Sequence, residues 1–327
     1  MYIILLSIIG GIIALGIGAE IIVRSAVNLA NIYKVSGYFV GFTLVALGTS
    51  LPELAATIQA LSVVNSIEIA LGNIIGSNIA NILLILGVVS ILQPIIFSEK
   101  KGQKNQTIMV MIFTIVAVVI FYIVFYLQNN YSLIFACILI SIFIFFLFFQ
   151  YKIELENQND EKVSTQYSHF FSYILLFIGL IFLYYGSKYF ILGSKELAFY
   201  FNISDTIIGL TLVAFGTSLP ELATGLVAAL RKQSNIAVGT ILGSNIYNIV
   251  GIFALILFLK PQTLLIGSNI LLINIILMTL VTFLFVYKVR FGFSILNIKP
   301  FHLGRTSGVV FLILYFIYTI YNYSHLG

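Results

Sequence analysis

The sequence predicts an all-α polytopic membrane protein in which ten transmembrane helices form two inverted repeats of five helices each. Three observations lead to this prediction: a very hydrophobic composition, ten apolar segments spread along the whole chain, and an internal duplication. Of the 327 residues, 61% are hydrophobic and 8% are charged, whereas soluble domains carry about 25% charged residues. So few charged side chains could not cover a water-facing surface, which argues against a soluble helical protein.

The apolar segments are each about 20 residues long, enough to cross a hydrocarbon core of about 30 Å. The first has no basic region before it and is too long for a cleaved signal peptide, so we expect it to be retained as a helix. The single cysteine, Cys137, cannot form an intrachain disulfide. The ten segments are 2–22, 38–62, 68–92, 107–127, 131–150, 170–190, 206–230, 236–259, 267–287 and 307–323.

The basic residues predict the orientation of these segments. The connections alternate between two sides, and 13 of the 16 lysines and arginines fall on one of them, leaving Lys188, Lys195 and Lys260 on the other. Short cytoplasmic loops carry the excess of basic residues. We therefore expect a multi-pass protein of the cell membrane with both termini extracellular and the polar linker 151–169 cytoplasmic. The net charge of +5 then needs no nucleic-acid partner.

The internal duplication is visible as sequence identity between two pairs of segments. Residues 41–55 (GFTLVALGTSLPELA) and 209–223 (GLTLVAFGTSLPELA) are identical at 13 of 15 positions, and residues 69–83 and 236–250 at 10 of 15. Each half contains five segments, and this odd number inverts the second copy in the membrane. Inverted repeats with interrupted helices place a transporter's site near the midplane, between the halves. The expected division is a first half at 1–150, the linker at 151–169 and a second half at 170–327.

The sequence Gly-Thr-Ser-Leu-Pro-Glu lies in the middle of an apolar segment in both halves, at 48–53 and 216–221. A proline has no N–H, so Pro52 and Pro220 remove the usual donor from the carbonyls of Gly48 and Gly216. Such carbonyls must face protein, water or an ion. Together with hydroxyl and carboxylate oxygens, they form a ligand set for a hard cation.

Glu53 and Glu221 occupy equivalent positions in the two copies. A charged acid at mid-span costs about 2.5–3.5 kcal/mol on insertion scales, and such residues are usually functional. No lysine or arginine lies at similar depth to neutralise them. One alternative keeps both glutamates protonated and hydrogen-bonded, but a divalent cation between two carboxylates is the simpler interpretation.

A second motif follows in each half. Asn73, Ser77 and Asn81 lie at i, i+4 and i+8, along one helix face, and the second copy repeats this stripe as Thr240, Ser244 and Asn248. The neighbouring glycine pairs, Gly72 with Gly76 and Gly239 with Gly243, have the small-xxx-small spacing that permits close helix packing. In a single copy, a stripe of this kind more often contributes to helix packing than to ion binding. Its repetition beside the glutamate-bearing segments favours a role in ligation.

These paired motifs resemble the two alpha repeats of the calcium/cation antiporter superfamily, and most closely its prokaryotic sodium/calcium exchangers. The resemblance implies ion sites at the centre of ten helices, with the first and sixth helices moving across a fixed core. Carried over by position, Glu53 and Glu221 are shared by Ca²⁺ and Na⁺, and Thr49 and Thr217 add carbonyls to the Ca²⁺ site. It also implies one Na⁺ site at Ala46, Thr49 and Ser77, its mirror at Ala214, Thr217 and Ser244, and a central cluster completed by Ser50, Ser218, Asn81 and Asn248.

Two positions depart from the family pattern. Asn248 stands where several prokaryotic relatives and potassium-dependent exchangers have aspartate, so the central site carries at most two negative charges. This disfavours a K⁺-dependent or proton-relay variant. Thr240 replaces the asparagine found at position 73 of the first copy.

The function expected from the sequence is secondary active antiport of Na⁺ for Ca²⁺ by alternating access, with the ions competing for the two-glutamate site. The expected partners are Na⁺, Ca²⁺ and the lipid bilayer, with no cofactor, no nucleic acid and no obligatory protein partner. Three alternatives remain: an H⁺- or K⁺-coupled exchanger of divalent cations (Ca²⁺ or Mn²⁺), an ion channel, and an intramembrane enzyme. The sequence contains no HExxH motif, no nucleophile elbow and no Ser–His pair at depth, which argues against an enzyme.

Overall fold

The computed structural model describes residues 2–62, 66–96, 101–127, 132–156, 166–200, 214–259, 269–292, 300 and 302–326. Within these ranges the chain is helical apart from short connections and two strands of two residues each. The first half contains α1 (Tyr2–Tyr33), α2 (Gly37–Val40), η1 (Gly41–Val45), α3 (Ala46–Thr49), α4 (Leu51–Ser62), α5 (Ile67–Ala80), η2 (Asn81–Ile85), α6 (Leu86–Leu92), β1 (Ile95–Ile96), α7 (Lys101–Leu127) and α8 (Ser132–Glu156). The second half contains α9 (His169–Tyr200), α11 (Ala214–Thr217), α12 (Leu219–Leu230), α13 (Ser234–Ile246), η4 (Tyr247–Ile252), α14 (Phe253–Leu259), α15 (Asn269–Phe291), β2 (His302–Leu303) and α16 (Arg305–Leu326).

The helices have the lengths and composition of membrane spans. Among the described residues, eight continuous helical stretches are long and apolar enough to cross a bilayer, and α12 is a shorter apolar helix. Large apolar side chains such as Phe316 and Ile320 point outward on the peripheral helix α16, as expected of a surface that faces lipid. The predicted all-helical, multi-pass architecture is confirmed. Parts of the predicted segments, at 131, 206–213 and 267–268, lie outside the described residues.

Helices α1 and α9 are longer than predicted. Each has 32 residues, so the predicted ends at residues 22 and 190 are wrong. Polar residues near and beyond the predicted end have partners within the structure: Glu20 and Arg24 form an ion pair one turn apart, and Asn28 Nδ2 donates to Ser172 Oγ of α9 at 2.7 Å.

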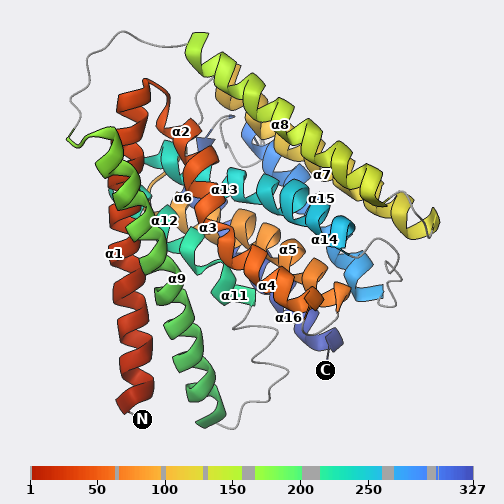
Figure 1. Cartoon of the computed structure of the whole chain (residues 1–327). Helices are drawn as coiled ribbons and strands as arrows, with labels where there is room; N and C mark the ends of the chain where they lie inside the picture. The colour runs from red at the N-terminus through yellow and green to blue at the C-terminus, as the bar shows by residue number, and fades with distance from the viewer. Residues whose placement is uncertain are drawn as a thin grey trace.

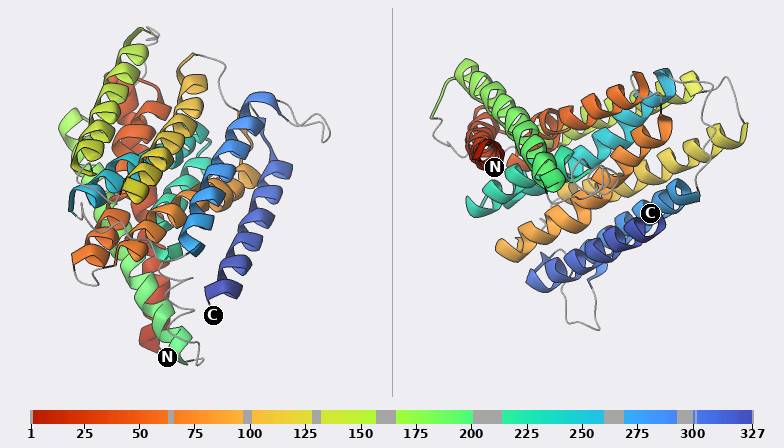
Figure 2. Two further views of the ribbon diagram at one scale, coloured as in Figure 1. Left: turned by 90° about the vertical axis from the view of Figure 1, so that its right-hand side faces the viewer. Right: turned by 90° about the horizontal axis from the view of Figure 1, so that it is seen from below.

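The pairing of α1 with α9 shows the inversion of the repeats directly. The two helices lie side by side at one edge of the molecule (Figures 1 and 2). A Cβ added to Gly11 would lie 2.7 Å from the Gly186 carbonyl oxygen, and one added to Gly18 would lie 2.8 Å from that of Gly179. Residue numbers rise along one helix while they fall along the other, so the pair is antiparallel. Because α1 and α9 are repeat equivalents, separated by 168 residues, the two halves run in opposite directions.

The interior consists of the helices that carry the duplicated motifs. Helix α13 packs against α2, η1 and α3, and the close approach requires glycine: a Cβ at Gly239 would lie 2.9 Å from the Phe42 nitrogen, and one at Gly41 would lie 2.6 Å from the Ile236 carbonyl oxygen. The predicted close packing is therefore confirmed at the second-half pair. At Gly72 and Gly76 an added Cβ meets nothing within 4 Å among the described residues. Their expected partner, the repeat equivalent of η1, lies outside those residues.

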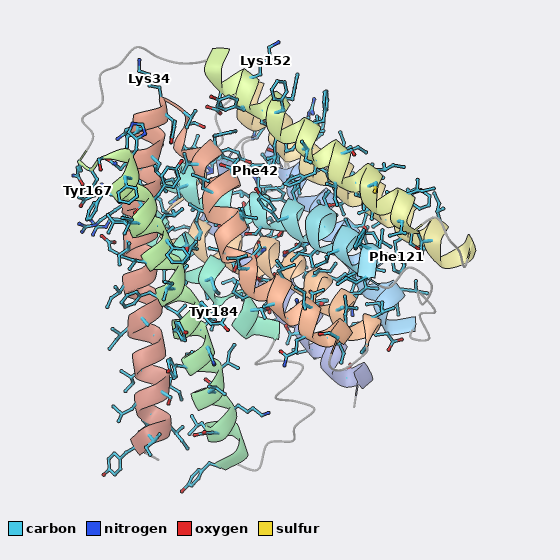
Figure 3. All side chains as sticks on the ribbon, in the orientation of Figure 1. Lys34, Phe42, Phe121, Lys152, Tyr167 and Tyr184 are labelled. Carbon is cyan, nitrogen blue, oxygen red and sulfur yellow. The ribbon has the colours of Figure 1, made fainter. Side chains whose placement is uncertain are left out.

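The remaining helices flank this interior. β1 and β2 form a small antiparallel pair that joins Ile95 to Leu303, a minor departure from an all-α fold. At one end, Glu154 of α8 accepts hydrogen bonds from both the backbone nitrogen and the hydroxyl of Ser36, at the start of α2. Figure 3 shows Lys34 and Lys152, which the sequence assigns to one side of the membrane, at the same end of the molecule.

Candidate cation-binding site

Both duplicated motifs interrupt their helices at the serine. Between α3 and α4 the backbone of Ser50 has φ −82° and ψ 2°, and between α11 and α12 that of Ser218 has φ −87° and ψ 5°. A new helix begins at the next residue in each copy, with the glutamate in its first turn. The partial positive charge of a helix N-terminus favours a carboxylate at this position. The predicted interruption is therefore confirmed in both halves.

The two glutamates are fully buried, with Glu53 and Glu221 each 0% exposed. Each accepts one hydrogen bond from the serine of the second motif in its own half: Ser77 Oγ lies 3.0 Å from Glu53 Oε1, and Ser244 Oγ lies 3.2 Å from Glu221 Oε1. Within the described part of the chain, the ion pairs are those of Glu20 with Arg24 and Arg231, and neither buried glutamate has a basic partner.

Hydroxyl groups link the two halves around the carboxylates. Ser77 Oγ lies 3.0 Å from Ser218 Oγ of the opposite half. Thr49 Oγ1 lies 3.3 Å from Ser244 Oγ, again across the repeat interface. Each serine that binds a glutamate therefore also contacts the interrupted helix carrying the other glutamate. The two motifs of both halves thus meet in one buried cluster.

Four asparagines complete the cluster, and sequence reasoning missed two of them, Asn78 and Asn245. Asn81 Nδ2 donates to Asn245 Oδ1 at 2.9 Å, and Asn248 Nδ2 donates to Asn78 Oδ1 at 3.2 Å. These bonds are equivalent under the repeat and cross between the halves. The signal was present, because Gly-Ser-Asn occurs in both copies. It was overlooked because these residues do not fall in the i, i+4, i+8 stripe.

The hydrogen bonds leave a matched set of buried oxygens without a partner among the described residues. These atoms are Glu53 Oε2, Glu221 Oε2, Asn81 Oδ1, Asn248 Oδ1 and Ser50 Oγ. A buried polar atom without a partner costs about 1–3 kcal/mol, and here four of the five form pairs equivalent under the repeat. Carboxylate, amide and hydroxyl oxygens are the ligands that hard cations such as Ca²⁺ take in proteins.

The other predicted ligands, Ala46, Thr217 and Ala214, do not share one pattern of contacts. Ala46 is buried and its carbonyl accepts from Thr49 Oγ1 at 3.3 Å. Thr217 Oγ1 donates to Asn73 Oδ1 at 3.4 Å. Ala214 begins α11, but its side chain lies outside the described residues.

The substitution at position 240 makes the halves unequal. In the first half, Asn73 Nδ2 donates to the Glu53 carbonyl at 3.1 Å and lies 3.3 Å from Thr57 Oγ1. The shorter Thr240 is also buried, and its hydroxyl has no hydrogen-bond partner among the described residues.

The π-helical turn η2 begins at Asn81, and the π-helical turn η4 begins at Tyr247, directly before Asn248. Such turns often occur at functional sites. Among the described residues, no group of three or more His, Cys, Asp or Glu side chains could hold a metal. The site therefore consists of two carboxylates surrounded by neutral oxygens.

A buried oxygen site between two inverted helical repeats defines this protein as a multi-pass membrane transporter. The chain belongs to the sodium/calcium exchanger protein family, whose family model matches residues 3–152 and 171–324.

Individual relatives are similar to this chain over three quarters of its length or more. An uncharacterised membrane protein of Methanocaldococcus jannaschii is 37% identical over 94% of both chains. The sodium/calcium exchanger MaX1 of Methanosarcina acetivorans is 29% identical, over 75% of this chain and 80% of its own. A solved structure of the sodium-calcium exchanger NCX_Mj, soaked without Na⁺ or Ca²⁺, has a TM-score of 0.78 and 32% sequence identity, covering 97% of this chain and 98% of that one.

Ser77 provides a moderate test of the site. Ser77→Ala removes the donor that positions the Glu53 carboxylate and the contact with Ser218. We expect cation affinity to fall roughly 10- to 150-fold, the effect of losing a hydrogen bond to a charged group. Calcium titration of the purified protein measures this change. Ser90→Ala is the matched control, because Ser90 Oγ bonds to the Gly87 carbonyl within its own helix. Equal affinities in the two variants would contradict the role of Ser77.

Proposed function

We propose that this chain is a secondary active antiporter that exchanges Na⁺ for Ca²⁺ across the membrane by alternating access. The observation that carries the proposal is the pair of buried glutamates, Glu53 and Glu221, with an unpartnered oxygen on each carboxylate. Two carboxylates balance the charge of one Ca²⁺, and the oxygens of Asn81, Asn248 and Ser50 supply neutral ligands. Membership of the exchanger family supports the same function.

Competition for the carboxylates couples the two ions in this scheme. Ca²⁺ would bind between Glu53 and Glu221, with carbonyls of Thr49 and Thr217 and the central residues Ser50, Ser218, Asn81 and Asn248 around it. Na⁺ ions would use the same glutamates, flanked by Ala46, Thr49 and Ser77 on one side and by Ala214, Thr217 and Ser244 on the other. Because the same carboxylates serve both ions, occupancy by one excludes the other.

Access would alternate through movement of α1 and α9 over the interior helices. The glycine-lined packing between α1 and α9 supports their movement as one unit. In this scheme the halves 1–150 and 170–327 act as the two repeats, joined by a cytoplasmic linker at 151–169. Both termini lie outside the cell, and the protein needs no cofactor, no obligatory partner chain and no enzymatic activity.

Calcium uptake into proteoliposomes tests the function, with Na⁺, K⁺ and H⁺ gradients imposed one at a time. We expect uptake of Ca²⁺ when the vesicles contain Na⁺ and the medium does not, and no uptake driven by a K⁺ or H⁺ gradient alone. Uptake driven by a pH gradient without Na⁺ would favour an H⁺-coupled exchanger. A conductance far above carrier turnover would instead indicate a channel.

A further inference from the structure

Helix α9 contacts the interrupted helix of the second half through a buried hydrogen bond. Ser187 Oγ donates to the Gly216 carbonyl at 2.6 Å, and Ser187 is 4% exposed. The helical donor for this carbonyl would be the nitrogen of residue 220, which is a proline and has no N–H. The hydroxyl of α9 therefore satisfies a carbonyl that the Gly-Thr-Ser-Leu-Pro-Glu motif leaves open, five residues before Glu221.

Side-chain packing continues the same contact. Ile191 lies one helical turn after Ser187, and its side chain occupies the space in which a Cβ of Gly216 would lie. Helix α9 therefore packs against the interrupted helix through a hydrogen bond and an apolar contact that lie within one turn of each other.

The first half lacks the hydrogen bond. Under the repeat offset of 168 residues, Gly48 is the equivalent of Gly216 and Ala19 is the equivalent of Ser187. Ala19 is buried but carries no hydroxyl, so α1 cannot donate to Gly48 in the same way. The space beside Gly48 is instead occupied by the side chain of Leu180, which also belongs to α9. The contact that α9 makes with the second interrupted helix therefore has no counterpart between α1 and the first.

We propose that Ser187 is a positioning residue whose hydroxyl stabilises one of the two access states by holding α9 on the Gly216 carbonyl. The proposal rests on the alternating-access function described above. Displacing α9 by about 1 Å would take the oxygen atoms beyond hydrogen-bond distance and leave the carbonyl without a donor in a membrane interior. One net hydrogen bond changes an equilibrium by roughly 2- to 12-fold, and this is the expected bias between the two states.

Spin-label distances measure this bias without depending on which ions are carried. The labels are attached to Leu192→Cys of α9 and Leu230→Cys of α12, both at exposed positions, in a Cys137→Ala background. In lipid nanodiscs, Ser187→Ala is expected to increase the population of a second distance roughly 2- to 12-fold. Ser187→Thr, which keeps the hydroxyl, is expected to restore the parent distribution. Identical distributions for the parent and Ser187→Ala would overturn the proposal.

Ala19→Ser is the matched variant in the other half. The two halves are related by inverted-repeat symmetry, and exchanging them converts one access state into the other. A new hydroxyl at position 19 should therefore stabilise the access state that Ser187 does not. Ala19→Ser is therefore expected to shift the distances in the same direction as Ser187→Ala, and the double variant is expected to shift them further. A shift in the opposite direction would contradict the proposal.

Transport gives a second measurement that a merely structural role would not change. In oriented proteoliposomes, the ratio of half-saturating Ca²⁺ concentrations at the two faces is expected to change by the same factor in Ser187→Ala. A fall in maximal rate with an unchanged ratio would argue against a positioning role. If the parent shows no Na⁺/Ca²⁺ exchange while Ser187→Ala still shifts the label distances, the proposed ions are wrong and the role of Ser187 stands.

Discussion

Replacing either Glu53 or Glu221 with glutamine is expected to abolish Na⁺-driven Ca²⁺ exchange while the protein remains folded. Glutamine has the same shape and keeps an oxygen that can accept from Ser77 or Ser244, so the hydrogen bonds of the site can persist. The variant removes one of two charges that would balance a divalent cation. Removing an uncompensated buried charge does not destabilise the empty protein. Calcium flux in proteoliposomes and thermal melting of the purified variants measure the two effects.

Glu68→Gln is the matched control for this experiment. Glu68 lies in the first turn of α5 and is exposed, so the same change in charge at this position should leave exchange intact. Retained Na⁺-driven Ca²⁺ flux in vesicles carrying Glu53→Gln or Glu221→Gln would refute the assignment of the two glutamates. A loss of folded protein in both variants would show that these residues serve stability instead.

Gly239→Ala is expected to cause the largest loss of stability of any glycine-to-alanine change among the described interior residues. The new Cβ would overlap the Tyr38 carbonyl and lie 2.9 Å from the Phe42 nitrogen, both of them backbone atoms. Backbone atoms cannot move aside as the end of a flexible side chain can, so α13 would have to separate from α2 and η1. Overpacking of this kind costs roughly 1–3 kcal/mol or more. Thermal melting of the detergent-solubilised protein measures the change.

Gly16→Ala provides the comparison for this variant. Gly16 lies on an exposed face of α1, and among the described residues an added Cβ meets nothing within 4 Å. Because alanine is the better helix former by about 1 kcal/mol, this variant should melt at the parent temperature or slightly above it. If Gly239→Ala and Gly16→Ala melt alike, the close packing of α13 against η1 is not required for stability.

The positions of the site residues could be predicted because the duplication marks them. An isolated glutamate or Gly-Thr-Ser-Leu-Pro-Glu sequence is a weak signal, but two copies 168 residues apart identify Glu53 and Glu221 as partners across one interface. The helix interruptions at Ser50 and Ser218 followed from the same motif, because the proline and glycine weaken the helix at that point.

Other features depend on three-dimensional contacts that a periodic pattern does not contain. The bonds from Asn81 to Asn245 and from Asn248 to Asn78 join different halves, so helix spacing within one half could not reveal them. The extension of α1 beyond residue 22 depends on partners for Glu20, Arg24 and Asn28, which hydropathy does not measure. The bond between Ser187 and Gly216 required knowing which face of α9 meets the interrupted helix.

Crystals of this protein soaked in Sr²⁺ offer the most direct measurement of the central claim, because anomalous scattering locates the bound ion. We expect one strong peak within bonding distance of the carboxylate oxygens that lack hydrogen-bond partners, one from each half of the molecule. The same peak should be absent from crystals of Glu221→Gln. A cation bound elsewhere, or carboxylates that remain unoccupied at saturating Sr²⁺, would contradict the account.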